Sequence, residues 1–528
     1  MSPATTGTDA DVLVIGGGHN GLTAGCYLAG AGRRVVLLEA SERIGGMTAS
    51  SALIPEAPDH VIHPCAVDMI FIRSTDIVSD LRLSDVGLRT ETPDPSYVYL
   101  HPEGGSIAFF RDPARTAADI ARFSRADAEA YPKFVAVLRG MLAMALPMMG
   151  TDPVRPAPGA LWAAVRAAVA HRRSLRPLLP LVTGTAEAAV NERFRHPAVR
   201  SALLALAGGG GPAATEGSGL GHLMVALLHF VGVARPLGGM QQLSEALASR
   251  FRASGGQIRT SARVREIVVV DGRARGVRLE DGSTVTARSV IATCDPYRAI
   301  CELLPDGAID RSARARIHDT PANVHGAAPA VLNVALAGPA TLAARFERTD
   351  GVDLRGAALL MGTEESVRGS YEATARGEMP ADPLLWGAIT TAGDPSQAPA
   401  GQDTVYVYVA TTPVSPPEGW PALRDSAEKT VHAKTARYFD GLEAELGRWF
   451  ETPDEMSARL GVRNGSVFHV DLTLTRVGPL RPAWGFGGGR TPVGGLFLGS
   501  AGSHPGPGVF GAPGKLAAAM TAKFLRTN

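Results

Sequence analysis

The sequence contains few cysteines. Only four of its 528 residues are cysteine, namely Cys26, Cys65, Cys294 and Cys301. None of them stands in a C-x-x-C motif or at another spacing typical of metal ligands. Disulfide reductases need a reactive cysteine pair, so this chemistry is rejected. We expect four reduced cysteines that pack as small apolar side chains, and no metal ion.

The sequence also lacks a surplus of charge and a long apolar segment. Its 52 basic and 51 acidic residues leave a net charge of +1, whereas a protein that binds nucleic acid needs a clear basic excess. No segment of about 18 residues, the length that spans a bilayer, is continuously apolar. Asp9 and Asp11 precede the first predicted strand, where a secretory leader would be apolar. We therefore expect no nucleic-acid partner and a cytoplasmic location.

What the sequence does contain is a glycine-rich turn near its start, in "DVLVIGGGHNGLTAGCYLAGAGRRVVLLEA". This segment predicts a strand, a tight turn, a helix and a second strand. Gly16, Gly18 and Gly21 have the G-x-G-x-x-G spacing that allows the turn, the approach of a pyrophosphate and close packing of helix on strand. The length of the chain predicts at least one further domain beside this nucleotide-binding unit.

The residues after this turn favour one dinucleotide over another. Glu39 ends the second strand, where a carboxylate accepts hydrogen bonds from ribose hydroxyls and repels the 2′-phosphate of NADP. The turn and Glu39 do not distinguish NAD from FAD. The continuation "EASERIGGMTAS" favours FAD, because Arg43 and the pair Gly45 and Gly46 offer the second close backbone approach that an extended flavin dinucleotide requires.

A second glycine-rich turn lies near the other end of the chain, in "GSAGSHPGPGVFGAPGK". Gly506, Gly508 and Gly511 leave backbone amides uncovered before a helix that we expect to begin near Ala512. Pro513 suits the first turn of that helix. A helix N-terminus directed at a flavin would stabilise the negative charge that develops when the flavin accepts hydride.

Both ends of the chain resemble one enzyme family. The segment "VIGGGHNGLTAGCYLAGAGRRVVLLEASERIGG" is similar to the N-terminal motif of FAD-dependent amine oxidases and phytoene desaturases. The segment "GLFLGSAGSHPGPGVFGAPGKLAAAM" is similar to the C-terminal motif of the phytoene desaturase branch, which includes carotenoid desaturases and saturases. Internal segments such as "PLGGMQQLSEALASRFRASGGQI" and "NGSVFHVDLTLTRVGPLRP" resemble phytoene dehydrogenase-related proteins.

The resemblance implies an α/β fold with two domains, each built from separate segments. The expected Rossmann-like FAD-binding domain is a doubly wound sheet assembled from residues 10–75, 235–296 and 456–528. An α+β substrate domain would comprise residues 76–234 and 297–455. The first of these insertions is predicted to be mainly helical, and the second contains alternating strand patterns in "AVLNVAL" and "DTVYVYVAT".

The resemblance also assigns site residues, including a valine whose backbone would meet the adenine ring. The predicted FAD-binding residues are Gly16, Gly18, His19, Asn20, Gly21, Glu39, Arg43, Gly45, Gly46, Val264, Gly502, Gly508 and Val509. The base that removes a substrate proton is predicted at His504, the titratable residue of the C-terminal turn. Other titratable candidates are Glu216, His222, His229, His469 and Asp471.

The implied activity is that of an FAD-dependent desaturase or dehydrogenase. A lipophilic or secondary-metabolite substrate would transfer hydride to flavin N5. One alternative is a flavin amine oxidase that acts on a C–N bond with O2 as acceptor, and another is a flavin-binding interaction protein without turnover. The electron acceptor, which is O2, a quinone or NAD, stays open.

The segment from Arg155 to Arg200 is rich in arginine, with eight arginines against two glutamates. It includes "LWAAVRAAVAHRRSLRPLLPLV", which predicts basic amphipathic helices. Such a helix can lie in the interface of an anionic membrane. The other interpretation is a solvated arginine face on a soluble helical domain, and the sequence leaves both open.

Overall fold

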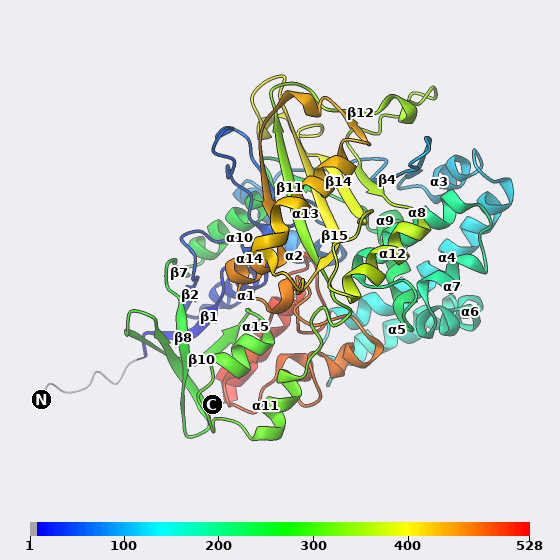
Figure 1. Cartoon of the computed structure of the whole chain (residues 1–528). Helices are drawn as coiled ribbons and strands as arrows, with labels where there is room; N and C mark the ends of the chain where they lie inside the picture. The colour runs from blue at the N-terminus through cyan, green and yellow to red at the C-terminus, as the bar shows by residue number, and fades with distance from the viewer. Residues whose placement is uncertain (1–7, 528) are drawn as a thin grey trace, which may run out of the picture.

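The computed structural model describes residues 8–527, which form two large β-sheets with helices around them (Figure 1). The strands of the first sheet are β1 (Ala10–Ile15), β2 (Val35–Leu38), β7 (Gln257–Arg259), β8 (Val264–Val270), β9 (Arg273–Leu279), β10 (Thr284–Ala292) and β18 (Leu496–Leu498). Strands β7, β2, β1, β10 and β18 run parallel to one another, and β10 also pairs antiparallel with β9. This arrangement confirms the predicted Rossmann-like sheet, with β1 at its centre.

The two faces of the first sheet are covered by different layers. Alternate side chains of a strand point to opposite faces. Val12 and Val14 therefore pack on helices, while Leu13 and Ile15 pack in a second cluster that includes side chains of β8 and β9, the antiparallel strands of the same sheet. The covering helices are α1 (His19–Gly30), α10 (Gln241–Ala253) and α15 (Ala512–Thr527). Helix α1 packs on both of the others, which brings the C-terminal helix beside the first glycine-rich turn.

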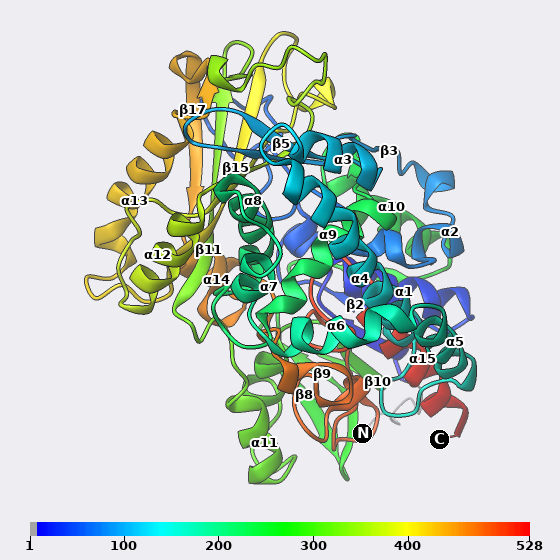
Figure 2. The ribbon, with the colours of Figure 1, turned by 90° about the vertical axis from the view of Figure 1, so that its right-hand side faces the viewer.

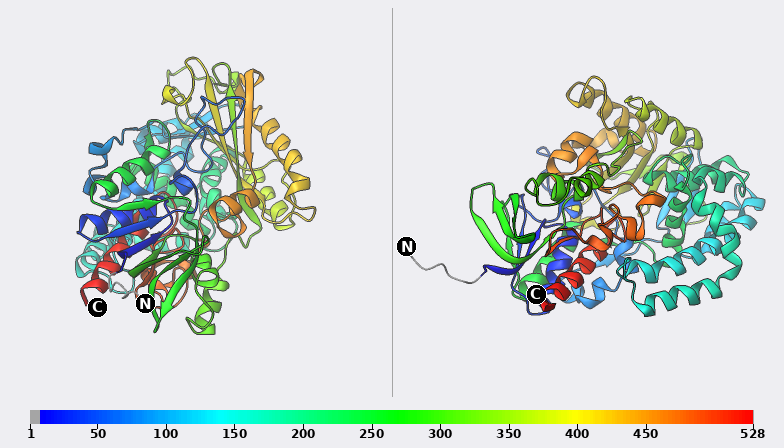
Figure 3. Two further views of the ribbon diagram at one scale, coloured as in Figure 1. Left: turned by 90° about the vertical axis from the view of Figure 1, so that its left-hand side faces the viewer. Right: turned by 90° about the horizontal axis from the view of Figure 1, so that it is seen from below.

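The second sheet is mostly antiparallel and stands beside the first (Figures 1 and 3). Its strands, in spatial order, are β17 (Glu445–Glu451), β11 (Ala327–Leu336), β15 (Asp403–Pro413), β14 (Leu385–Ile389), β13 (Ala358–Met361), β4 (Tyr97–Leu100) and β5 (Ser106–Phe109). Strands β4 and β5 come from the insertion that was predicted to be mainly helical. Strand β4 pairs in parallel with β13, so the two insertions share one sheet.

A group of helices covers one face of the second sheet and is coloured cyan to green in Figure 2. These helices are α3 (Pro113–Ile120), α4 (Arg125–Met149), α5 (Pro158–Ala170), α6 (Arg172–Thr183), α7 (Ala186–Asn191), α8 (Pro197–Ala207) and α9 (Leu223–Phe230). Within the described residues, α4 is the one helix with the length and composition to cross a membrane. Its inner face is part of the core, where the hydroxyl of Tyr131 lies 2.7 Å from Nε2 of His229 in α9.

The remaining elements are short or cover the edges of the sheets. Helix α13 (Trp420–Thr435) packs on the second sheet opposite the helical group, with Leu423 and Val431 in the shared core. The other elements are α2 (Ile77–Asp80), α11 (Arg311–His318), α12 (Glu364–Ala375), α14 (Pro453–Leu460), β3 (Thr90–Glu91), β6 (Arg235–Pro236), β12 (Thr341–Leu342) and β16 (Phe439–Asp440). The domain boundaries predicted from the sequence stay a prediction.

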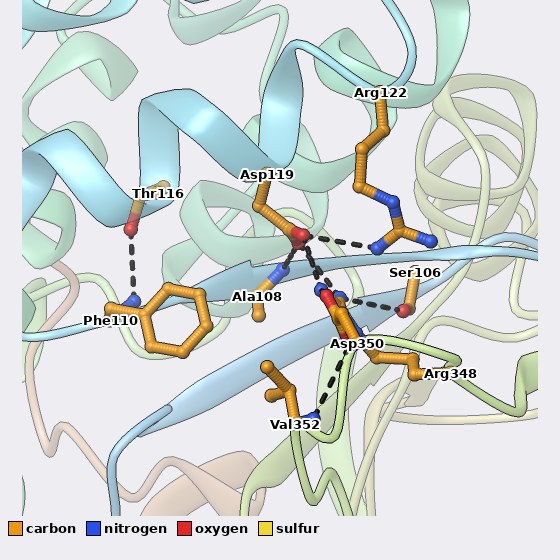
Figure 4. A network of polar contacts seen from close by, with 9 residues as sticks. All are labelled: Ser106, Ala108, Phe110, Thr116, Asp119, Arg122, Arg348, Asp350 and Val352. Atoms are coloured by element: carbon orange, nitrogen blue, oxygen red, sulfur yellow. Dashed lines mark hydrogen bonds and ion pairs between the residues drawn. The ribbon is translucent and has the colours of Figure 1, made fainter.

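A buried ion pair ties α3 to the edge of the second sheet (Figure 4). Asp119 accepts hydrogen bonds from the Ala108 backbone N–H at 2.7 Å and from Arg348 at 2.6 and 3.1 Å. The side chains of Asp119 and Arg348 are each only 3% exposed. Arg348 also contacts Asp350, and this hydrogen bond raises the pKa of the guanidinium, followed by the contribution of Asp119.

Candidate cofactor site

The first sheet has a cavity of about 510 Å³ at the ends of its parallel strands. Strands β1 and β10 end side by side, with Ile15 opposite Ala292, and ligands bind at this edge in open parallel sheets. The predicted residues that line the cavity are Gly16, Gly18, His19, Asn20, Gly21, Glu39, Arg43, Gly46 and Val264. The structure therefore brings together residues from both ends of the first motif and from the middle segment of the chain.

The first glycine-rich turn leaves no room for a side chain at Gly16 or Gly21. A Cβ added to Gly21 would lie 2.0 Å from the carbonyl oxygen of Gly16 and 2.9 Å from Oγ1 of Thr293. Gly16 has a φ of +104°, which residues with side chains rarely adopt. Helix α1 follows from Gly18, its N-cap, without any capping side chain. The first N–H groups of α1 are thus available to an anionic group at the cavity.

The carboxylate of Glu39 is held in place by two backbone N–H groups at the cavity. Its Oε2 accepts a hydrogen bond from Gly17 N–H at 2.7 Å, and its Oε1 accepts one from Ser41 N–H at 2.8 Å. Each carboxylate oxygen can accept a further hydrogen bond. The carboxylate is therefore fixed at the cavity with acceptor capacity to spare, and its binding of ribose hydroxyls stays a prediction.

The pair Gly45 and Gly46 runs beside the first turn. Gly45 donates its N–H to the carbonyl of Gly17 at 3.0 Å and forms an isolated parallel bridge with Gly18. A Cβ on Gly46 would lie 3.5 Å from Cα of Gly18. Gly46 lines the cavity, whereas Gly45 supports it from outside. A second glycine pair therefore lies at the cavity beside the first turn, and its approach to FAD stays a prediction.

The C-terminal turn lies beside the first helix, and of its residues Ala501 lines the cavity. A Cβ on Gly514, in the first turn of α15, would lie 2.0 Å from the carbonyl oxygen of Asn20. A Cβ on Gly508 would lie 2.4 Å from the ring of Phe71. The predicted residues Gly502, Gly508 and Val509 are not part of the cavity lining. Their direct contact with FAD stays a prediction.

Several buried polar atoms at the cavity have no partner within the protein. They are Nε2 of His19, Oδ1 of Asn20 and Nδ1 of His469. Burial lowers the pKa of His19 to about 4, so its imidazole is neutral at pH 7. Because unpaired buried polar groups are costly, these atoms fit a polar ligand such as the diphosphate and ribityl parts of FAD. FAD bound there would supply a hydride acceptor.

The structure places His504 against helix α4 instead of along the cavity. Its Nε2–H donates to the carbonyl of Met148 at 3.1 Å, and burial lowers the pKa of its imidazole. Its Nδ1 is buried without a partner, so the ring keeps one free acceptor. The prediction that His504 is the catalytic base stays a prediction.

The other titratable candidates are dispersed. His222 bonds to the carbonyl of Ala186 and His229 to Tyr131, both inside the helical group. Asp471 accepts the backbone N–H groups of residues 323 and 324. Only His469 lines the cavity.

Sequence reasoning missed several residues of the cavity lining. Thr293 and Arg298 follow β10, Arg263 precedes Val264, and Arg459 ends α14. Residues after β10 could have been found from the sequence, because the ends of neighbouring parallel strands meet at one edge. Nothing in the sequence around Arg459 indicates its place.

The glycine turns, the placed carboxylate and the unpaired polar atoms together describe a dinucleotide site, and one comparison decides its family. A model of flavin-containing amine oxidoreductases matches residues 21–416 of the chain. The chain belongs to this family. Flavin-containing amine oxidoreductases are FAD-dependent, so the cofactor of this member is FAD and its activity is that of an oxidoreductase.

The similarity of this flavin-containing amine oxidoreductase to its relatives covers nearly its full length. Pyridine nucleotide-disulfide oxidoreductase domain-containing protein 2 of Mus musculus is 28% identical over 98% of this chain and 94% of its own. The lycopene-forming phytoene desaturase of Pseudescherichia vulneris is 26% identical over 97% and 98%. A putrescine oxidase redesigned in cofactor binding shares the fold, with a TM-score of 0.61 at 17% identity over 98% and 99%.

The four cysteines of this family member do not pair in disulfides, although the name of one relative mentions a disulfide. All four are free, and burial raises the pKa of the thiols of Cys26, Cys65 and Cys294 to about 12. Thiols in this state are poor nucleophiles at pH 7. This agrees with the expectation of reduced, packed cysteines.

Proposed function

We propose that the protein removes two hydrogen atoms from neighbouring atoms of a lipophilic substrate and leaves a double bond. One hydrogen leaves as hydride, which bound FAD accepts at N5, and the other leaves as a proton that completes the reduced flavin. Dioxygen or a quinone then takes the two electrons and two protons and becomes hydrogen peroxide or a quinol. The relatives named as phytoene desaturases support this reaction class.

The charges that line the cavity carry the proposal of an uncharged substrate. Among the described residues of the lining, the only carboxylates are Glu39 and Glu42, both beside the predicted ribose. Arg43, Arg263 and Arg298 bring positive charge to the same cavity, which suits the diphosphate of FAD. A protonated amine would need a carboxylate or an aromatic cage. Neither carboxylate is thus placed for the ammonium group of a substrate that meets FAD at the far end of this cavity, and the lining gives no support to an amine substrate.

The surface between the second sheet and the helical group also supports a lipophilic substrate. Trp386 and Tyr408 lie on the inner strands β14 and β15, yet both are only half-buried. Their rings are 6.2 Å apart, and the indole N–H is already bonded to the carbonyl of Ala205. The remaining surface of these rings is apolar, as a hydrocarbon chain would require.

The reaction is tested by anaerobic reduction of the FAD-loaded protein. Phytoene in detergent is expected to bleach the flavin absorbance and to yield a product with an additional conjugated double bond, whereas putrescine is expected to do neither. Addition of air or of a soluble quinone to the bleached protein then identifies the electron acceptor by the rate at which the flavin colour returns.

Two other outcomes would select the alternatives. Bleaching by an amine, with hydrogen peroxide and a carbonyl product in air, would establish an amine oxidase, an activity carried by the same fold. A flavin that is bound but bleached by neither hydrocarbons nor amines would favour an interaction protein without turnover.

We also propose that helices α5 and α6 hold the protein at an anionic membrane surface. No residue of α5 is buried, and both helices lie at the rim of the helical group (Figures 1 and 2). Leu161, Val165 and Val169 are spaced four apart on one side of α5 and are 45%, 51% and 62% exposed. Trp162 and, on α6, Leu179 are 64% and 67% exposed. Such a set of exposed apolar side chains is uncommon on a soluble protein.

The charges around these apolar side chains favour anionic lipid as the partner. Residues 153–186 contain five arginines and neither aspartate nor glutamate. Arg166, Arg172, Arg173 and Arg176 are all exposed. Basic residues near an apolar face bind the headgroups of anionic lipids while the apolar side chains enter the acyl boundary. A lipophilic substrate could then reach the enzyme from the bilayer.

Replacing Arg166, Arg172, Arg173 and Arg176 by glutamine is expected to weaken binding to anionic vesicles at least about 100-fold, because each basic residue contributes about 1 kcal/mol. Co-sedimentation with vesicles that contain phosphatidylserine measures the effect. The matched control replaces the same number of exposed arginines outside the helical group, Arg252, Arg265, Arg275 and Arg311. Equal loss in both variants, or no sedimentation of the parent protein, would refute the membrane contact.

A further inference from the structure

His469 is a cavity residue that the glycine motifs do not explain. It lies between α14 and β18, is 6% exposed and lines the cavity. Its Nδ1 is buried and has no hydrogen-bond partner. Burial lowers the pKa of its imidazole, so the ring is neutral at pH 7 and offers one N–H donor and one acceptor.

The backbone at His469 is in the left-handed region, with a φ of +60°. Residues with a branched or bulky side chain rarely adopt this conformation, and asparagine adopts it more readily than most. Histidine is enriched in this region as asparagine is, so the turn presents the His469 side chain at little backbone cost.

Arg481 fixes the turn that carries His469. It is fully buried and donates hydrogen bonds to the carbonyls of Phe468 at 3.1 Å and Val470 at 2.8 Å, the two neighbours of His469. It also donates to the carbonyl of Ala501 at 2.9 Å, and Ala501 lines the same cavity. Burial lowers the pKa of Arg481 to about 9. One guanidinium thus joins the His469 turn to the C-terminal turn.

His19 reaches the cavity from the other glycine-rich turn. It begins α1, is 7% exposed, and its Nε2 also lacks a partner. His19 and His469 line the same cavity, and burial lowers the pKa of the His19 imidazole to about 4. The cavity is therefore bordered by two neutral rings from opposite ends of the chain.

We propose that His469 donates a hydrogen bond from its ring to the diphosphate–ribityl part of FAD, beside His19, and that Arg481 is its positioning residue. Helix α1 begins at His19, so the phosphates of FAD are expected next to both rings. A donor to an anionic oxygen forms a stronger bond than a donor to a neutral one. The proposal depends on FAD as cofactor and is independent of the substrate.

The test compares two replacements of His469 by their affinity for FAD and by the visible spectrum of the bound flavin. His469→Leu removes the donor and is expected to weaken FAD binding about tenfold or more, whereas His469→Asn is expected to stay within about threefold of the parent. Asparagine carries an N–H donor near the position of Nδ1 and accepts the backbone conformation. Titration of the apoprotein with FAD, followed by flavin fluorescence, measures the affinity of each variant, and the visible spectrum is recorded once FAD is bound.

The control is His222→Leu, which removes a buried histidine of the helical group that also has an unpaired Nδ1. It is expected to keep the parent affinity for FAD. Native affinity in His469→Leu, equal weakening in His469→Asn, or equal weakening in the control would overturn the proposal.

The role of Arg481 is tested by non-additivity. Arg481→Lys keeps the charge but loses some of the hydrogen bonds that the guanidinium donates to backbone carbonyls. This change is expected to weaken FAD binding and to alter the flavin spectrum. Combined with His469→Leu it should weaken binding no further, because both changes remove the same contact. Independent, additive effects would show that Arg481 does not act through His469.

Discussion

Replacing Gly21 by alanine is expected to abolish FAD binding. The added methyl group would lie 2.0 Å from the carbonyl oxygen of Gly16, which is backbone and cannot rotate away. To relieve this contact, α1 must move off β1 and the turn must open, so the first N–H groups of the helix leave the phosphate position. We expect the affinity for FAD to fall at least about 100-fold, equivalent to about 2.7 kcal/mol.

Fluorescence titration of apoprotein with FAD measures this loss, and the same helix offers a matched control. Gly30 ends α1, and a Cβ there would have no atom within 4 Å. Gly30→Ala should therefore keep the parent affinity and lose no stability, because alanine is the better helix former. Tight FAD binding by Gly21→Ala would mean that the cofactor does not use this turn.

The nucleotide half of the site could be predicted because its determinants are local in the sequence. Gly16, Gly21 and Glu39 lie within one strand–helix–strand unit, and the geometry of that unit is nearly invariant. The beginning of α15 was also predicted correctly at Ala512. In each case the pattern and the structure that it specifies are separated by only a few residues.

The rest of the site depends on contacts between distant segments, which periodicity does not encode. His469 reaches the cavity only because Arg481 holds its turn against Ala501. Strands β4 and β5 join the second sheet only because β13, more than 250 residues later, offers β4 a parallel edge. A short apolar segment such as "YVYL" carries no information about its partner.

Breaking the ion pair between Asp119 and Arg348 is expected to destabilise the protein strongly. Asp119→Asn keeps an acceptor for the Ala108 N–H but directs an amide group at a guanidinium that is 3% exposed. Arg348 keeps Asp350 as a partner but loses its buried carboxylate, and breaking a buried pair in this way costs up to roughly 3 to 5 kcal/mol. Urea-induced unfolding of the FAD-loaded variant, followed by circular dichroism, is expected to show a loss of this size.

Asp350 is the second carboxylate that pairs with Arg348 (Figure 4). A change at this residue separates the effect of burial on stability from the effect of charge. Asp350 pairs with the same guanidinium, and this hydrogen bond holds the pKa of its carboxyl well below the usual range, but its side chain is 46% exposed. Water replaces the lost contact there, so Asp350→Asn should cost less than about 1 kcal/mol. Adding Arg348→Met to Asp119→Asn should cost less than the sum of the two single changes, because both changes break the same ion pair. Equal losses for Asp119→Asn and Asp350→Asn would contradict the assignment of the stability to the buried pair.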